Sequence, residues 1–151
     1  MLLPHKRLVS AYGRVVESGQ IAPFSLNFIH VPRPADGPPL ITINVQLDES
    51  RGPELDAFVN ELRLIYLRNG AYSWQLFADP TRHNHFQVQI MMPSWSQYLL
   101  LCERITQDEK KLIDQAQNLH VGENPPDIQM YIRVSKRFRK IVRDGSDLLR
   151  N

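Results

Sequence analysis

Histidine is the side chain best suited to acid–base chemistry near neutral pH, and this sequence places histidines at two informative points. His120 precedes a Gly-x-x-Pro-Pro loop, where it could exchange a proton or, as we favour, cap a helix end and interact with the helix dipole. His83 and His85 flank Asn84 at a spacing that could share a metal ion. No third ligand lies nearby in the sequence, so we predict no metal site.

Aromatic and amide side chains could supply a different function, the lining of a pocket for a planar small molecule. Trp74 lies on a predicted strand and Trp95 opens a predicted helix. Trp74 and its neighbour Tyr72 are equally explained as core, which is the interpretation we favour. The candidate pocket residues are Trp74, Trp95, His120, Asn44, Gln75 and Gln89.

Covalent catalysis finds no support among the residues. Cys102, the one cysteine, lies on an apolar helical stripe with no base beside it in the sequence, which favours a buried and inert thiol. The chain also lacks a phosphate-binding glycine loop, a Gly-x-Ser-x-Gly motif and a His-Glu-x-x-His motif. We therefore predict no catalytic residue and no cofactor.

Hydrophobic periodicity predicts the elements that position these side chains. Residues 40–47 alternate strictly, with Ile41, Ile43, Val45 and Leu47 on one face, as in a half-buried strand. The later segments switch between period two and the helical period. The expected order is a strand at 40–47, a helix at 53–69, strands at 71–78 and 85–92, a helix at 94–105, a helix from 106, and a strand at 128–134.

This βαββααβ order is typical of an α+β, ferredoxin-like fold with an antiparallel sheet. Helices cover one face of such a sheet, so the other face meets water or a partner. Because that face is polar but uncharged, we expect a homodimer that closes two sheets into an α/β barrel. The residues expected on this polar face are Thr42, Asn44, Gln46, Ser73, Gln75, Phe77, Gln87, Gln89 and Met91.

Composition divides the chain into three parts. Residues 1–39 hold six of the eleven prolines, which favour extended backbone. We expect an extended arm over 1–38, with a short helix at 8–18, and the ferredoxin-like domain over 39–134. We expect a basic helical tail over 135–151.

The formal net charge of +2 is concentrated in that tail. Residues 133–151 carry seven basic and two acidic groups. A basic tail could bind phosphates of nucleic acid or of an anionic membrane, but a solvated helix end explains the charges equally well and is favoured. We do not expect nucleic acid as a partner. The tail cations concerned are Lys136, Arg137, Arg139, Lys140 and Arg143.

The expected location is the cytoplasm. The longest apolar run, Leu99–Cys102, is far below the ~18 residues of a membrane span. Pro4 and charged residues follow Met1 too closely for a secretory signal. A single cysteine fits a reducing compartment.

Scattered motifs occur in order over residues 21–134: Asn69-Gly70-Ala71-Tyr72-x-Trp74-x-Leu76-Phe77-x-Asp79, Ser94-Trp95, Glu103-Arg104-Ile105-Thr106 and His120-x-Gly122-x-x-Pro125-Pro126. These motifs resemble the C-terminal segment of major facilitator proteins of the transmembrane secretion effector type, relatives of the enterobactin exporter. The resemblance implies a cytosolic domain of an exporter-like protein, with a fold similar to the dimeric α/β barrels of small monooxygenases. Leu100, Leu101 and Cys102 depart from the polar run of the family, and Met130 replaces a family histidine.

From this resemblance we expect a non-catalytic accessory domain that acts in dimerisation and small-molecule sensing. The expected partners are a second copy of the chain, a small molecule, and a membrane transporter region in cis or in trans. The alternative is a cofactor-free, monooxygenase-like enzyme that uses a cavity between sheet and helices.

Overall fold

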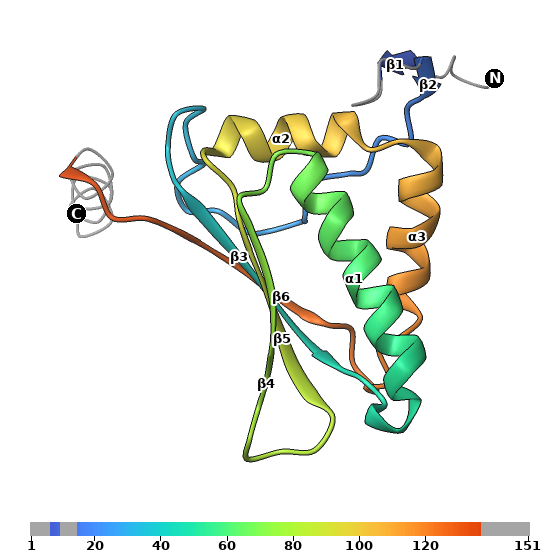
Figure 1. The fold of residues 1–151 in the computed structure, drawn as a ribbon. Coiled ribbons are helices and arrows are strands. Elements are labelled where there is room, and N and C mark those ends of the chain that lie inside the picture. The colour runs from blue at the N-terminus through green and yellow to red at the C-terminus, as the bar shows by residue number, and fades with distance from the viewer. Residues whose placement is uncertain (1–6, 10–14, 137–151) are drawn as a thin grey trace.

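A four-stranded antiparallel sheet with three helices packed on one face forms the domain in the computed structural model, which describes residues 7–9 and 15–136 (Figure 1). The strand order is β4-β5-β3-β6. This arrangement confirms the α+β, ferredoxin-like fold. The elements are β3 (Pro39–Gln46), the short 3₁₀ helix η1 (Glu49–Arg51), α1 (Gly52–Arg68), β4 (Ser73–Ala78), β5 (His85–Met91), α2 (Trp95–Arg104), α3 (Gln107–Gln117) and β6 (Asp127–Ile132).

The helices begin and end where local chemistry satisfies their free backbone groups. A proline lies in the first turn of α1. Gly70 follows the end of that helix with a φ of +111°, a conformation that residues with a Cβ rarely adopt. The Ser94 side chain accepts from the backbone N–H of Gln97 at the start of α2. Thr106 and Glu109 form a reciprocal capping box at the start of α3.

Alternation along the strands separates the two faces of the sheet. In β3, Ile41 and Ile43 face the helices, and Ile41 is only 1% exposed. Thr42 and Asn44 face the other way, and register places them beside residues of both neighbouring strands. The core lies between the sheet and the helices and includes Ile65, Trp74, Ile90, Met92, Trp95, Tyr98, Leu101, Cys102 and Ile105.

An extended strap, residues 18–38, precedes the sheet and lies along α2. Its backbone N–H groups at Gly19 and Ile21 donate to the carbonyls of Ile105 and Cys102, at 2.7 and 2.9 Å. A Cβ at Gly19 would lie 2.2 Å from the Thr106 carbonyl oxygen, so only glycine fits this close approach. The strap therefore covers the side of α2 with backbone hydrogen bonds as well as apolar contacts.

The N-terminal part of the arm differs from the expected helix at 8–18. β1 (Arg7–Val9) pairs antiparallel with β2 (Val15–Glu17) instead. Val9, Val15 and Val16 are β-branched, which favours strand over helix and explains the difference.

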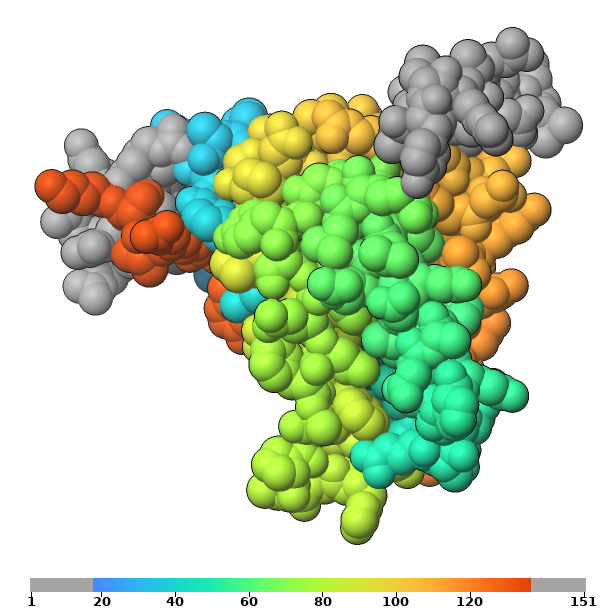
Figure 2. Space-filling model, in the orientation of Figure 1, coloured from blue at the N-terminus to red at the C-terminus, as the bar shows by residue number. Residues whose placement is uncertain are grey.

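The two ends of the molecule differ in shape. The turn between β4 and β5 projects beyond the helices, and the strap lies beside the end of β6 at the opposite end (Figure 2). There the backbone N–H of Arg133 donates to the Pro38 carbonyl at 3.1 Å. Of the predicted tail cations, Lys136 is described and exposed, whereas Arg137, Arg139, Lys140 and Arg143 lie outside the described residues.

Candidate functional site

An apolar cavity of about 250 Å³ lies between the sheet and the helices α1 and α3. We call it the inner cavity. Its walls come from both layers of the fold and from Phe24 of the strap. The lining residues are almost all aliphatic or aromatic, among them Ile43, Val59, Leu62, Trp74, Leu76, Val88, Ile90, Ile113 and Ile128.

Tyr66 of α1 is the buried polar residue of this cavity. Its side chain and backbone together are only 7% exposed. Burial, with a smaller contribution from the nearby Cys102 thiol, raises the pKa of the Tyr66 hydroxyl to about 12. Among the described residues, none forms a hydrogen bond with this hydroxyl. The cavity therefore contains a protonated phenol with an unused donor.

Two neighbouring groups under the strap are buried as well. Tyr98 accepts a hydrogen bond at its hydroxyl oxygen from the backbone N–H of Phe24, at 2.9 Å. Burial raises the pKa of the Tyr98 hydroxyl and that of the Cys102 thiol. A thiol held in its neutral form is a poor nucleophile, which agrees with an inert Cys102.

His120, after α3, lies at the boundary of the inner cavity. Its Nδ1 accepts from the backbone N–H of Gln46 at 2.9 Å, so we assign the ring proton to Nε2. Nε2 then donates to the Asn124 carbonyl at 2.7 Å. Both ring nitrogens thus bind backbone, and the side chain joins the end of β3 to the loop before β6. A Cβ at Gly122 would lie 2.6 Å from Nε2, so a larger residue there would displace the His120 ring from these contacts.

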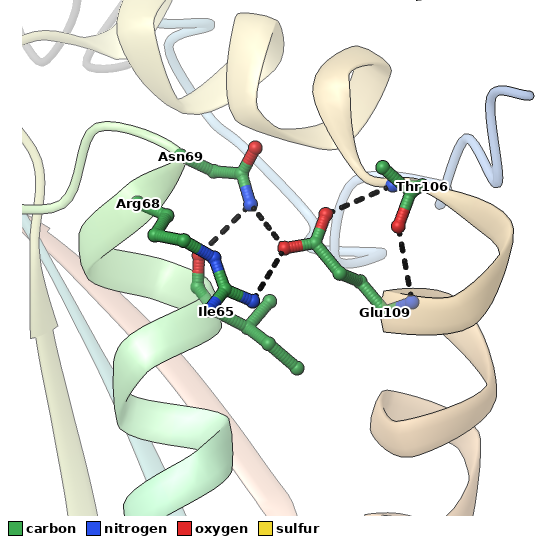
Figure 3. Close-up of polar contacts among 5 residues, drawn as sticks. All are labelled: Ile65, Arg68, Asn69, Thr106 and Glu109. Atoms are coloured by element: carbon green, nitrogen blue, oxygen red, sulfur yellow. Dashed lines mark hydrogen bonds and ion pairs between the residues drawn. The ribbon is translucent and has the colours of Figure 1, made fainter. Parts of the chain in front are cut away.

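The helices that form one wall of the cavity are joined by Glu109, the third residue of α3 and a member of its capping box with Thr106 (Figure 3). Its Oε1 accepts from the backbone N–H of Thr106 at 3.0 Å. Its Oε2 accepts from Arg68 at 3.0 Å and from the Asn69 side chain at 3.2 Å. Asn69 also donates to the Ile65 carbonyl at 2.8 Å. The carboxylate therefore fixes the C-terminus of α1 against the N-terminus of α3.

The face of the sheet without helices carries a chain of polar side chains. Gln89 donates to Gln87 at 2.8 Å, and Gln87 donates to Asn44 on the neighbouring strand at 3.0 Å. Asn44 donates to Asp127 of β6 at 3.5 Å. The chain of contacts continues along β6, and we name the whole set the amide ladder: Gln89, Gln87, Asn44, Asp127, Gln129 and Tyr131.

Exposed aromatic rings lie at the edges of the same face, at the end of the amide ladder and beyond it. Phe77 of β4 is 44% exposed and Tyr131 of β6 is 52% exposed. Tyr72, just before β4, is 52% exposed, and its hydroxyl lies 3.7 Å from the Met91 sulfur. The placement of Tyr72 in the core was therefore wrong, because β4 starts one residue later and Tyr72 lies outside its alternation. We name the surface of the sheet that no described helix covers the outer face.

An open groove of about 860 Å³ lies at the end of the sheet near the β4–β5 turn. Asp79 and Arg82 line it and form an ion pair at 2.9 Å. Hydrogen bonds from the hydroxyl and backbone N–H of Thr81, and then from Arg82, hold the pKa of Asp79 well below its usual range. These contacts fix the turn. Because Glu123 and Asp127 also line the groove, its walls carry charges of both signs.

The structure separates the predicted pocket residues into three places. Trp74 and His120 line the inner cavity. Trp95 is buried under the strap, with its ring edge-on to Phe28 at a centroid distance of 5.6 Å. Asn44, Gln75 and Gln89 lie on the outer face, with Asn44 and Gln89 in the amide ladder.

Two residues of these sites are not marked as functional by the sequence. Tyr66 lies within the predicted helix at 53–69, and hydrophobic periodicity reports burial but not whether a hydroxyl has a partner. Asp127 fell before the predicted start of the last strand at 128. No group of three metal-ligating side chains occurs in the part of the chain that the structure describes.

Comparison with known proteins adds a family and a fold. A family model described as transmembrane secretion effector matches residues 20–138. No curated protein matches the chain. Within residues 7–9 and 15–136, no helix is both long and apolar enough to span a bilayer.

Several solved structures share the fold. A protein from Caulobacter crescentus, provisionally described as an antibiotic biosynthesis monooxygenase, is 15% identical with a TM-score of 0.56, over 68% of this chain and 94% of that one. A protein of the same description from Bordetella bronchiseptica is 12% identical with a TM-score of 0.51, over 64% and 97%. A conserved protein from Methanosarcina mazei is 10% identical with a TM-score of 0.51, over 62% and 89%. At these identities the likeness shows the fold alone.

Proposed function

This chain belongs to the transmembrane secretion effector family, and we propose that it serves as a non-catalytic accessory domain that dimerises and binds a small molecule. The outer face is the observation that carries the proposal. In a protein of this family, the domain would act beside a membrane transporter region, in cis or in trans. We place this activity in the cytoplasm.

The chemistry of the outer face suits a second copy of the same chain. Each amide offers both donors and an acceptor, so two copies related by a two-fold axis can pair the same groups with each other. The described face has one carboxylate, Asp127, which its neighbours already hold by hydrogen bonds. The exposed rings of Phe77 and Tyr131 supply apolar area at its edges.

The size of the outer face is adequate for such an interface. Four strands about 4.8 Å apart and six to eight residues long cover roughly 19 by 20–27 Å. Two apposed faces would bury about 800–1,000 Å² in projection, and side-chain relief increases this toward the ~1,200 Å² of a specific interface.

A charge placed on the outer face tests the dimer. Gln89→Lys puts an ammonium into the amide ladder of both copies, where the two charges repel each other. Ala57→Lys adds the same charge to an exposed position of α1 and serves as the control. Sedimentation velocity should give the mass of two chains for the wild type and for Ala57→Lys, and of one chain for Gln89→Lys. A wild-type monomer at tens of micromolar would contradict the proposal.

The inner cavity favours a second candidate, a cofactor-free, monooxygenase-like enzyme acting on a small molecule. Two solved structures of the same fold carry that description. Oxygen uptake with a panel of hydroquinones tests it. Oxygen uptake that is lower in Tyr66→Phe than in the wild type would support an enzyme. No uptake with any hydroquinone would reject the enzyme and favour the non-catalytic domain.

A further inference from the structure

The inner cavity has a specific chemical preference. We propose that it binds a compact, neutral and largely apolar molecule whose hydrogen-bond acceptor is held by the Tyr66 hydroxyl. This inference rests on the proposed small-molecule role of the domain, and it adds the ligand class and the residue that selects it.

The Tyr66 hydroxyl is the first observation. Tyr66 is more than nine-tenths buried and lines the cavity, yet its hydroxyl has no hydrogen-bond partner among the described residues. In the same part of the chain, no side-chain nitrogen or oxygen is both inaccessible and unpartnered. The hydroxyl therefore borders open space, which here is the cavity. The described residues supply no partner, so this donor is available to a molecule that enters the cavity.

The rest of the lining excludes a charged ligand. No aspartate, glutamate, lysine or arginine is among the lining residues. The two polar side chains besides Tyr66 are His120, whose ring nitrogens both bind backbone, and Gln117, which is exposed at the rim. An unpaired charge in such surroundings would lose its hydration without compensation. The ligand must therefore be neutral.

Volume and shape limit the ligand further. The 250 Å³ of the cavity is slightly below the roughly 300–1,000 Å³ of pockets for drug-sized molecules. Trp74 and Tyr66 provide aromatic surface, and the strand side chains provide aliphatic surface. A molecule with one ring and one carbonyl or ether oxygen matches these walls.

Three probes of nearly equal shape separate these requirements. Acetophenone is neutral and has a carbonyl acceptor, isopropylbenzene lacks the acceptor, and benzoate is charged. Dissociation constants are measured by titration with ligand-observed NMR for the full chain, for Tyr66→Phe, and for Tyr72→Phe as the exposed tyrosine control. Circular dichroism confirms the fold of each variant.

We expect acetophenone to bind the wild type and Tyr72→Phe equally. Tyr66→Phe should weaken acetophenone about 2- to 12-fold, the effect of one net hydrogen bond, and leave isopropylbenzene unchanged. Benzoate should bind more weakly than either neutral probe. Ala116→Phe, which fills the cavity from α3, should abolish binding of both neutral probes.

Other results overturn the inference. These are no binding of either neutral probe to the wild type, equal affinity of acetophenone for the wild type and Tyr66→Phe, or benzoate binding as tightly as acetophenone. Undiminished binding in Ala116→Phe would place the ligand elsewhere and has the same consequence. Sedimentation of the same samples reports the dimer separately, so a monomer with Tyr66-dependent binding rejects only the dimer, and a dimer without it rejects only this inference.

Discussion

The hydroxyl of Tyr66 makes the stability of the protein depend on pH in the alkaline range. Burial raises its pKa to about 12, whereas an unfolded tyrosine loses its proton near pH 10. The folded state thus holds a proton that the unfolded state releases. The corresponding stability is fully present below about pH 10 and is lost as the pH rises toward 12.

We therefore expect wild type and Tyr66→Phe to diverge in alkali. Between pH 9 and pH 12, the free energy of unfolding should fall by about 2–3 kcal/mol more in the wild type than in Tyr66→Phe, because each pKa unit corresponds to 1.36 kcal/mol. Urea unfolding at several pH values measures this. Tyr72→Phe, at an exposed position, should behave as the wild type. An identical pH profile for wild type and Tyr66→Phe would show that the hydroxyl is not buried.

The sequence predicted the location of side chains better than their roles. His120 is a proton-transfer or helix-capping candidate from its position before a glycine loop, but its two ring nitrogens instead bind the backbone of Gln46 and of Asn124, neither of which belongs to α3. Tyr66 stood in a helical stripe with nothing to mark it. Its importance comes from the absence of a partner, which depends on tertiary packing around the hydroxyl.

At the scale of elements, one carboxylate joins two helices. Glu109 completes the capping box of α3 and binds Arg68 and Asn69 at the end of α1, with its side chain 12% exposed. Asp108 occupies the same helical turn, but its side chain is 96% exposed. Its carboxylate lies 4.0 Å from the Lys111 ammonium. The two residues carry the same charge but differ in their contacts, so each serves as a control for the other.

Removing each carboxylate should separate capping from simple charge. Glu109→Ala should lower the free energy of unfolding by about 1–3 kcal/mol, because it removes the cap and leaves Asn69 with fewer partners. Asp108→Ala should change it by less than about 0.5 kcal/mol. Chemical denaturation of both variants measures the difference. Equal effects would mean that only the helix dipole is involved.

The strap is a second element, and a side chain of α2, Tyr98, binds its backbone at Phe24. The Tyr98 hydroxyl accepts from the backbone N–H of Phe24, and the two rings stack at a centroid distance of 6.1 Å. Tyr98→Phe should cost about 1 kcal/mol of unfolding free energy and should speed hydrogen exchange at the Phe24 amide. Exchange at Ile21, which is bonded to backbone, should change less. Unchanged exchange at Phe24 would show that the strap is held elsewhere.

Elements were predictable to the extent that their pattern is local. Strict alternation over 40–47 and the helical periodicity over 53–69 predicted β3 and α1 to within one residue at each end. The arm has no such pattern, and its β1–β2 pairing depends on contacts between segments that alternation within one segment does not encode. Tyr72 was misplaced for a similar reason, since the start of β4 depends on its partner β5.

At the scale of the whole molecule, sequence motifs and family comparison agree. The resemblance to transmembrane secretion effectors is confirmed by a family match over residues 20–138. The separation of the sheet into a core face and a polar face was also predicted from alternation, and register confirms it. The partner of the polar face is a second molecule, which the sequence and fold of one chain do not describe. The dimer therefore stays a prediction.

We propose that two copies of the chain meet through their outer faces. The most direct measurement is an isotope-filtered NOE experiment on a mixture of labelled and unlabelled chains, which reports only contacts between copies. The account predicts intermolecular signals between the side-chain amides of Asn44, Gln87 and Gln89 and the ring protons of Phe77 or Tyr131. Intermolecular signals confined to the helices, or none in a sample of two-chain mass, would contradict it.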